Sequence, residues 1–170
     1  MRAPDRFPLL IAGVSGSGKT TVAQAWSQRH QSEFIEGDLF HSAASVAKMR
    51  AGVPLDDDDR HGWLDRLVSA VAERPGRRPP VLTCSALKRS YRDRLREGIP
   101  ALRIALLEVS YPLALERVSG RTGHYMPSTL VASQFGAFER PSGEPRTVVL
   151  DGAEPVERLL DAVEDWLARE

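Results

Sequence analysis

Residues 13–20 read Gly-Val-Ser-Gly-Ser-Gly-Lys-Thr, and no other segment says as much about the fold. The octamer fits the pattern G-x-x-x-x-G-K-S/T, in which a glycine-rich turn aims backbone N–H groups at the phosphates of a nucleotide. Lys19 adds a positive charge for the outer phosphates, and the hydroxyl of Thr20 is a suitable ligand for Mg²⁺. The pattern predicts a phosphate site made by consecutive residues: Gly13, Val14, Ser15, Gly16, Ser17, Gly18, Lys19 and Thr20.

The residues on either side of the octamer support this interpretation. Residues 7–12 form a short apolar run that is typical of a buried strand, and residues 19–30 have helical character. A helix that begins at the end of the octamer adds the positive end of its dipole to the anion site. The alternative is a flexible glycine turn before a helix, which this order of elements disfavours.

Short apolar segments alternate with amphipathic ones along the whole chain. The expected strands are residues 7–12, 33–36, 80–84, 102–109 and 146–150. The expected helices are residues 19–30, 42–51, 60–73, 87–97, 111–121, 127–139 and 155–168. This alternation predicts an α/β fold in three layers, a mainly parallel five-stranded sheet with helices on both faces. Ligands of such sheets bind at the carboxyl ends of the strands, so the residues that follow each strand are site candidates.

Length and charge limit the class of protein. A chain of 170 residues predicts one domain over residues 1–170. Lys plus Arg and Asp plus Glu both number 23, and this balance argues against a protein that binds nucleic acid or a membrane surface. Cys84 is the only cysteine, and residues 1–8 lack the apolar core of a signal peptide. We therefore expect a cytoplasmic protein that acts on small molecules.

Asp38 follows the second expected strand and is the first candidate for chemistry. Its carboxylate would face the phosphate loop, where it can accept a proton from an attacking hydroxyl or hold Mg²⁺ through water. The alternative is an N-cap for the next helix, and the position after a strand favours the functional role. His41 lies three residues on, where a substrate contact and a local hydrogen bond are equally good interpretations.

Two segments carry cations that suit an acidic substrate. Residues 56–59 are four aspartates, two of which a solvated helix cap explains, and Arg60 follows them. An arginine held among acids can offer a bidentate fork to a substrate carboxylate. Lys88 begins a helix after a strand and can point into the site, and Arg92 shares its helix face at the i+4 position.

Arg117 and Arg121 are also four residues apart, and a segment with Gly123 and Pro127 follows them. This pattern predicts a mobile lid over about residues 121–130 that closes on the phosphates and excludes water. The alternative is an ordinary surface loop after a helix that ends in arginines.

The order of motifs along nearly the whole chain resembles the gluconokinase family of small P-loop kinases. The motifs are residues 13–20, Glu-Gly-Asp-Leu-Phe-His at 36–41, Lys-Met at 48–49, Gly-Val-Pro-Leu-Asp-Asp-Asp-Asp-Arg at 52–60, Cys-Ser-Ala-Leu-Lys-Arg-Ser-Tyr-Arg-Asp-Arg-Leu-Arg at 84–96, Gly-His-Tyr-Met at 123–126 and Ser-Gln-Phe at 133–135. The resemblance implies phosphorylation of D-gluconate at its 6-hydroxyl by ATP with Mg²⁺. It also implies a P-loop NTPase fold like that of nucleoside monophosphate kinases, with a mobile lid, and a homodimer. A kinase of another small hydroxy acid such as shikimate and a non-catalytic ATP-binding module are the alternatives.

The resemblance also assigns roles to residues. Similarity to shikimate kinases implies that Asp38 meets the substrate hydroxyls and that Arg60 grips its carboxylate. Similarity to adenylate kinases implies that Arg117 stacks on adenine, that Arg121 reaches the phosphates, and that the loop containing Pro155 reads the adenine edge. The implied catalytic residues are Lys19, Asp38 and Arg121. The implied substrate residues, centred on a helical segment over residues 38–73, are Asp38, His41, Lys48, Arg60, Lys88, Arg92, His124 and Gln134.

Overall fold

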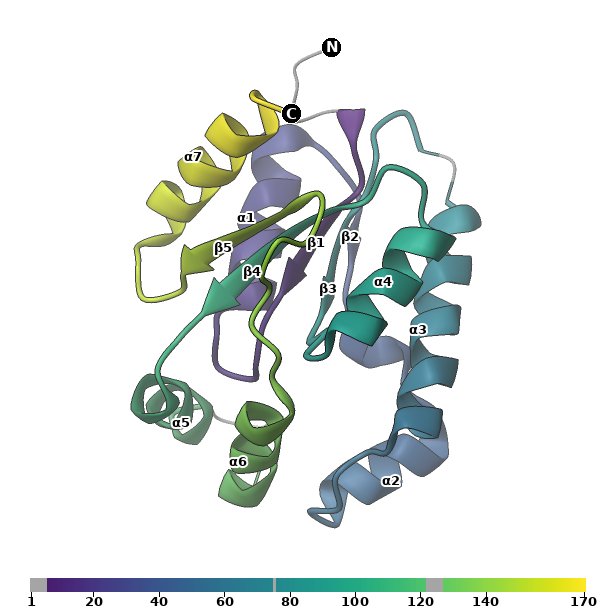
Figure 1. Cartoon of the computed structure of the whole chain (residues 1–170), viewed down its shortest axis with the longest axis vertical. Helices are drawn as coiled ribbons and strands as arrows, with labels where there is room; N and C mark the ends of the chain where they lie inside the picture. The colour runs from purple at the N-terminus through teal and green to yellow at the C-terminus, as the bar shows by residue number, and fades with distance from the viewer. Residues whose placement is uncertain (1–5, 75, 122–126) are drawn as a thin grey trace.

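The computed structural model describes residues 6–74, 76–121 and 127–170. The strands are β1 (Leu9–Ala12), β2 (Phe34–Ile35), β3 (Val81–Cys84), β4 (Arg103–Glu108) and β5 (Thr147–Asp151). The helices are α1 (Lys19–His30), the 3₁₀ turn η2 (Gly37–Phe40), α2 (Ala43–Arg50), α3 (Asp57–Ala72), α4 (Arg89–Gly98), α5 (Tyr111–Ser119), α6 (Ser128–Ala137) and α7 (Val156–Leu167). The strands form one parallel sheet in the order β2-β3-β1-β4-β5, which confirms the predicted α/β fold (Figure 1).

The sheet is covered on both faces because side chains alternate along each strand. Leu10 and Ala12 of β1 face α3 and α4, where Trp63, Leu64, Leu67, Tyr91 and Leu95 complete one core. Leu9 and Ile11 face α1 and α7, where Val22, Ala23, Trp26, Leu160 and Val163 complete the other. The helices of Figure 1 thus form two outer layers around the sheet, as the sequence predicts.

The remaining helices lie beyond the carboxyl ends of the strands. There α5 and α6 pack on the phosphate loop through Ala114, Val118 and Val131, which contact Val14. Figure 1 shows α2 beyond the same edge of the sheet, on the side away from α5 and α6. The helices that can shape a ligand site therefore frame the carboxyl edge. No helix in the described ranges is long and apolar enough to cross a membrane.

Helix α3 begins earlier than the predicted residue 60, and the reason is its cap. Asp56 is the N-cap: its Oδ1 accepts a hydrogen bond from the Asp59 N–H at 2.8 Å, and Asp59 Oδ2 accepts from the Asp56 N–H at 3.1 Å. This reciprocal capping box satisfies two N–H groups that the first turn would otherwise leave unpaired. Two of the four aspartates therefore cap the helix, which confirms that part of the sequence analysis.

Candidate functional site

Residues 13–18 form the turn from β1 into α1, and their backbone requires glycine. Gly13, Gly16 and Gly18 have φ angles of 145°, 83° and 95°, which residues with a Cβ rarely adopt. A Cβ on Gly16 would also lie 2.5 Å from the carbonyl oxygen of Ala114 in α5. The glycines of the octamer thus permit both the turn and its close contact with α5.

Lys19 lies where several charges of the predicted site meet. Its Nζ donates a hydrogen bond to the Val14 carbonyl oxygen at 3.0 Å. Burial lowers the pKa of the Lys19 ammonium, while the nearby negative charges of Asp38 and Glu36 act to raise it and the positive charge of Arg121 acts to lower it. Lys19, the turn at residues 36–38 and Arg121 come from three separate segments of the chain. The fold brings them close enough for their charges to act on Lys19.

Glu36 is the closest acid to the predicted metal ligand. Thr20 Oγ1 donates a hydrogen bond to Glu36 Oε2 at 2.8 Å, and Thr83 Oγ1 donates to the other oxygen of the same carboxylate. Across the described part of the chain, no three His, Cys, Asp or Glu side chains are grouped as a metal site. A cation beside Thr20 would therefore depend on water and phosphate oxygens, which suits Mg²⁺ because it retains several waters and prefers oxygen ligands.

Asp38 lies in η2 and is not a helix cap, because Ser42 caps α2 instead. The Asp38 side chain is 75% exposed, and its Oδ1 is 4.0 Å from Nε2 of His41. His41 stacks on Trp63 with ring centroids 4.1 Å apart, and burial lowers the pKa of its imidazole. Trp63 Nε1 donates to the Gly37 carbonyl oxygen at 2.7 Å, so the α3 core anchors the turn that carries Asp38.

Arg60 and Lys88 converge on the ring of Tyr91. The Arg60 guanidinium carbon is 5.6 Å from the ring centroid and Lys88 Nζ is 5.5 Å from it. The Tyr91 hydroxyl donates to Asp57, and Lys88 Nζ donates to the same carboxylate at 2.9 Å. These two hydrogen bonds, that of Tyr91 first, lower the pKa of Asp57. The ring of Tyr91 thus lies beside both cations and Asp57 pairs with Lys88, whereas the sequence suggested only that aspartates hold Arg60.

Arg117 links the phosphate loop to the turn between β5 and α7. Its Nη1 donates to the Gly16 carbonyl oxygen at 3.2 Å, and its Nη2 donates to that of Gly152 at 3.0 Å. Pro155 is the N-cap of α7 in the same turn. The residues expected to hold adenine therefore lie next to the loop expected to hold phosphates. Arg121 follows the end of α5, and its backbone N–H donates to the Val118 carbonyl oxygen.

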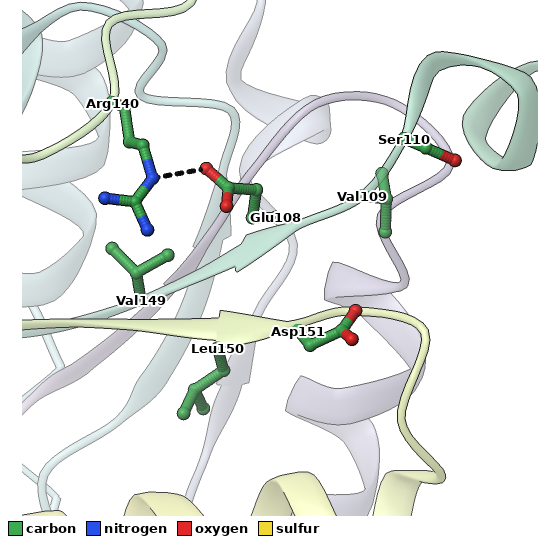
Figure 2. A pocket seen from close by; sticks show the side chains of 7 residues that line it. All are labelled: Glu108, Val109, Ser110, Arg140, Val149, Leu150 and Asp151. Atoms are coloured by element: carbon green, nitrogen blue, oxygen red, sulfur yellow. Dashed lines mark hydrogen bonds and ion pairs between the residues drawn. The ribbon is translucent and has the colours of Figure 1, made fainter.

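A separate cavity of about 580 Å³ lies at the carboxyl ends of β4 and β5. Figure 2 shows Arg140 pointing toward Glu108, with Nε and Oε2 2.8 Å apart, and Leu150 pointing away from them. The lining residues are Glu108, Val109, Ser110, Arg140, Val149, Leu150 and Asp151. Asp151 begins the loop, residues 151–156, that is expected to read the adenine edge, so the cavity borders that part of the predicted site.

Comparisons with known proteins agree on one family. A family model described as an AAA domain matches residues 9–144. The probable gluconokinase of Schizosaccharomyces pombe is 41% identical over 86% of this chain and 79% of its own length. A gluconokinase crystal structure from Sinorhizobium meliloti 1021 is 43% identical, covers 99% of this chain and 94% of its own, and superposes with a TM-score of 0.86. The chain belongs to the gluconokinase family.

A second gluconokinase agrees with this assignment, and a more distant structure shares the fold alone. The thermoresistant gluconokinase of Escherichia coli K12 is 36% identical over 92% of this chain and 90% of its own length. An APS kinase structure from Mycobacterium tuberculosis shares the fold, with a TM-score of 0.68 at 19% identity. As a P-loop kinase of this family, the protein uses ATP.

Arg92 does not lie where the gluconokinase resemblance implied. Its side chain is 0% exposed, and it forms an ion pair with Glu144 in which Nη2 and Oε1 are 2.5 Å apart. Its Nη1 also donates to the carbonyl oxygens of Ala86 and Leu87. Helical spacing placed Arg92 on the face of Lys88, but the loop after α6 brings Glu144 over it. These contacts count against a direct contact between Arg92 and substrate.

Two other predicted substrate residues have structural partners. Lys48 Nζ donates to Asp59 Oδ2 at 2.6 Å, which ties α2 to the cap of α3. The Gln134 side-chain oxygen accepts from the Ser15 N–H at 2.7 Å, so α6 holds the phosphate loop. His124 lies outside the described residues.

Sequence reasoning passed over Glu36, Thr83, Tyr91 and Glu144. Glu36 had a usable signal, because it is the last residue of an expected strand and begins the motif at residues 36–41. Thr83 and Glu144 had no such signal, and Tyr91 had only its place in the motif at residues 84–96. Tyr91 and Glu144 depend on how α3, α4 and the loop after α6 pack, and Thr83 reads as an ordinary strand residue.

Proposed function

We propose that this protein is a gluconokinase that transfers the γ-phosphoryl group of ATP to the 6-hydroxyl of D-gluconate, giving 6-phospho-D-gluconate and ADP. Family membership supports the substrate. The observation that carries the mechanism is that Lys19 follows the glycine turn and holds the Val14 carbonyl oxygen, while the charges of Asp38, Glu36 and Arg121 act on the pKa of its ammonium. A phosphate holder and a proton acceptor in one place are what phosphoryl transfer to an alcohol requires.

The donor end of the reaction uses the loop and its neighbours. The backbone of residues 13–18 and the Lys19 ammonium hold the ATP phosphates, and Arg117 and Pro155 hold the adenine. Mg²⁺ bound near Thr20 would neutralise charge on the phosphates. Arg121 stabilises the negative charge that spreads over the transferring group.

The acceptor end uses η2, α3 and α4. Asp38 accepts the proton of the 6-hydroxyl as the new O–P bond forms, and ADP leaves with the electrons of the broken bond. His41, kept neutral by burial, can hydrogen-bond a substrate hydroxyl. Arg60 and Lys88, which both lie beside the Tyr91 ring, bind the substrate carboxylate. Lys48 and Gln134 support this site by positioning α2 and the phosphate loop.

The wider organisation is also part of the proposal. We propose one domain over residues 1–170, a lid over about residues 121–130 that closes on the nucleotide, a homodimer and a cytoplasmic location. Light scattering on the purified protein tests the dimer.

A substrate panel tests the proposed activity. ADP release is measured by a coupled assay with gluconate, shikimate and several other sugar acids, and ³¹P NMR locates the phosphate on the product. We expect activity with gluconate and a phosphate on its 6-hydroxyl. If the protein phosphorylates another acid in preference to gluconate, that acid is its substrate. ATP binding without ADP release on any acid would instead mean a non-catalytic module.

A further inference from the structure

Lys88 is the N-cap of α4, and its side chain cannot cap the helix. An N-cap side chain normally accepts a hydrogen bond from the first turn, and a lysine ammonium has no lone pair with which to accept one. The Lys88 side chain makes no such bond to α4. Its ammonium donates to Asp57 at 2.9 Å and lies 5.5 Å from the centroid of the Tyr91 ring. The first N–H of α4 therefore needs an acceptor from another part of the chain.

Glu139, in the segment that follows α6, supplies this acceptor. Its Oε2 accepts a hydrogen bond at 2.7 Å from the N–H of Arg89, the first residue of α4. The N–H of Glu139 donates to the Leu87 carbonyl oxygen at 2.8 Å. The side chain and the backbone of one residue thus bond to the neighbours of Lys88 on both sides. Together the two contacts fix the direction in which the Lys88 side chain leaves the backbone.

The backbone just before Lys88 is strained and depends on its contacts. Ala86 is fully buried and has a φ angle of 43°, in the left-handed region that a residue with a Cβ seldom adopts. Arg92 Nη1 donates to the carbonyl oxygens of Ala86 and Leu87 at 2.9 and 3.0 Å. A strained segment keeps its shape only while its surroundings hold it, so the loss of a contact beside Lys88 can move the ammonium.

The segment that carries Glu139 is itself held in place. Arg92 Nη2 donates to the Glu139 carbonyl oxygen at 2.9 Å, and Phe138 packs against the core. Five residues before Glu139, the side-chain oxygen of Gln134 accepts from the Ser15 N–H of the phosphate loop at 2.7 Å. Residues 134–139 therefore contact both the loop expected to bind ATP and the start of the helix that follows Lys88.

We infer that Glu139 is a positioning residue of the acceptor site, which holds Lys88 where its ammonium can bind the substrate carboxylate. This role depends on the proposed binding of gluconate by Lys88. The charge of Glu139 would repel an acidic substrate, so its contribution is made through Lys88. The carboxylate of gluconate lies at the opposite end from the 6-hydroxyl, so a displaced Lys88 weakens binding of the ground state and of the transition state alike. Such a loss raises KM and leaves kcat unchanged.

Steady-state kinetics of the full-length protein test this role with two variants of one residue. Glu139→Ala removes the acceptor, and we expect it to raise the KM for gluconate by about three- to tenfold, with kcat and the KM for ATP within about twofold of the wild type. Glu139→Gln should keep the wild-type KM, because an amide oxygen can accept the same hydrogen bond.

Ser110→Ala is the matched control for the loss of a helix cap. Ser110 is the N-cap of α5, where its hydroxyl accepts from the Leu113 N–H at 3.3 Å, and α5 carries none of the predicted acceptor residues. Both alanine variants should lower the thermal midpoint by about 2–4 °C. Only Glu139→Ala should raise the KM for gluconate.

Amide hydrogen exchange followed by NMR tests the same contact without any reaction. The Arg89 N–H should exchange about tenfold faster in Glu139→Ala than in the wild type, and at close to the wild-type rate in Glu139→Gln. A raised KM without faster exchange at this N–H would overturn the inference, because the effect would then reach the substrate by another route.

An unchanged KM in Glu139→Ala, or an equal rise in Ser110→Ala, would also overturn the inference and leave Glu139 as a structural cap. If the wild type does not phosphorylate gluconate, the proposed function fails by itself. The KM comparison is then made with the acid that the wild type does phosphorylate. If it phosphorylates none, the exchange rate of the Arg89 N–H decides.

Discussion

Replacement of Glu144 by glutamine should destabilise the protein without weakening substrate binding. The carboxylate is 2% exposed and accepts three hydrogen bonds: from Arg92 Nε at 2.9 Å, from Arg92 Nη2 at 2.5 Å and from Arg96 Nη2 at 2.7 Å. Glutamine keeps one oxygen but turns an NH₂ group toward these donors. It leaves the buried Arg92 without a counter-ion, whereas Arg96 keeps its ion pair with Asp93 at 2.7 Å. Breaking a buried ion pair in this way typically costs about 3–5 kcal/mol.

The lower end of that range applies here because Arg92 keeps other acceptors. Its guanidinium also donates to the carbonyl oxygens of Ala86, Leu87 and Glu139. We therefore expect a loss of about 3 kcal/mol in the free energy of unfolding. For a domain of this size, such a loss lowers the thermal midpoint by about 6–12 °C.

The assay combines thermal unfolding followed by circular dichroism with steady-state kinetics below the midpoint. The KM for gluconate should stay close to the wild-type value. Asp65→Asn is the matched control, because Asp65 pairs with Arg94 at 2.7 Å in an exposed setting and should cost about 1 kcal/mol or less. A rise in KM of about tenfold with an unchanged midpoint would refute the reasoning, because it would mean that Arg92 serves the substrate.

Three further predictions concern η2 and its supports. Asp38→Asn should reduce kcat by about 10²–10⁴-fold and leave the midpoint of urea unfolding unchanged. A kcat near the wild-type value would mean that Asp38 is not the proton acceptor. Trp63→Phe loses the hydrogen bond to Gly37 and should cost about 1–3 kcal/mol in urea unfolding together with a lower kcat; a variant as stable as wild type would contradict the anchoring role. Because burial lowers the pKa of His41, the unfolded chain binds more protons, so stability from this group is lost as pH falls below about 6.5. In His41→Gln, the urea midpoint should therefore depend less on pH below about 6.5 than it does in the wild type. The same dependence in both proteins would contradict the assignment of this effect to His41.

The chain order of the elements and the nucleotide loop could be predicted because each depends on neighbours in sequence. The period of apolar residues shows strands and helices, and the octamer at residues 13–20 carries its own turn chemistry. The first residue of α3 was predicted three positions too late, at residue 60, because a capping box made of two aspartates looks like a plain acidic run. The position of Asp38 after a strand was enough to nominate it.

The sequence by itself determined the family, the parallel sheet and the loop that meets phosphates, because local pattern and strand order specify them. Only the tertiary structure decided which charged groups are free to act. Arg92 looks like a binding residue on its helix, yet Glu144, 52 positions away, holds it in the interior. Glu36 looks like a strand-end acid, yet the close approach of β2 to β3 directs it to Thr20. The cost of leaving a buried charge unpaired makes such long-range pairings decisive, and the spacing of residues along a chain does not reveal them.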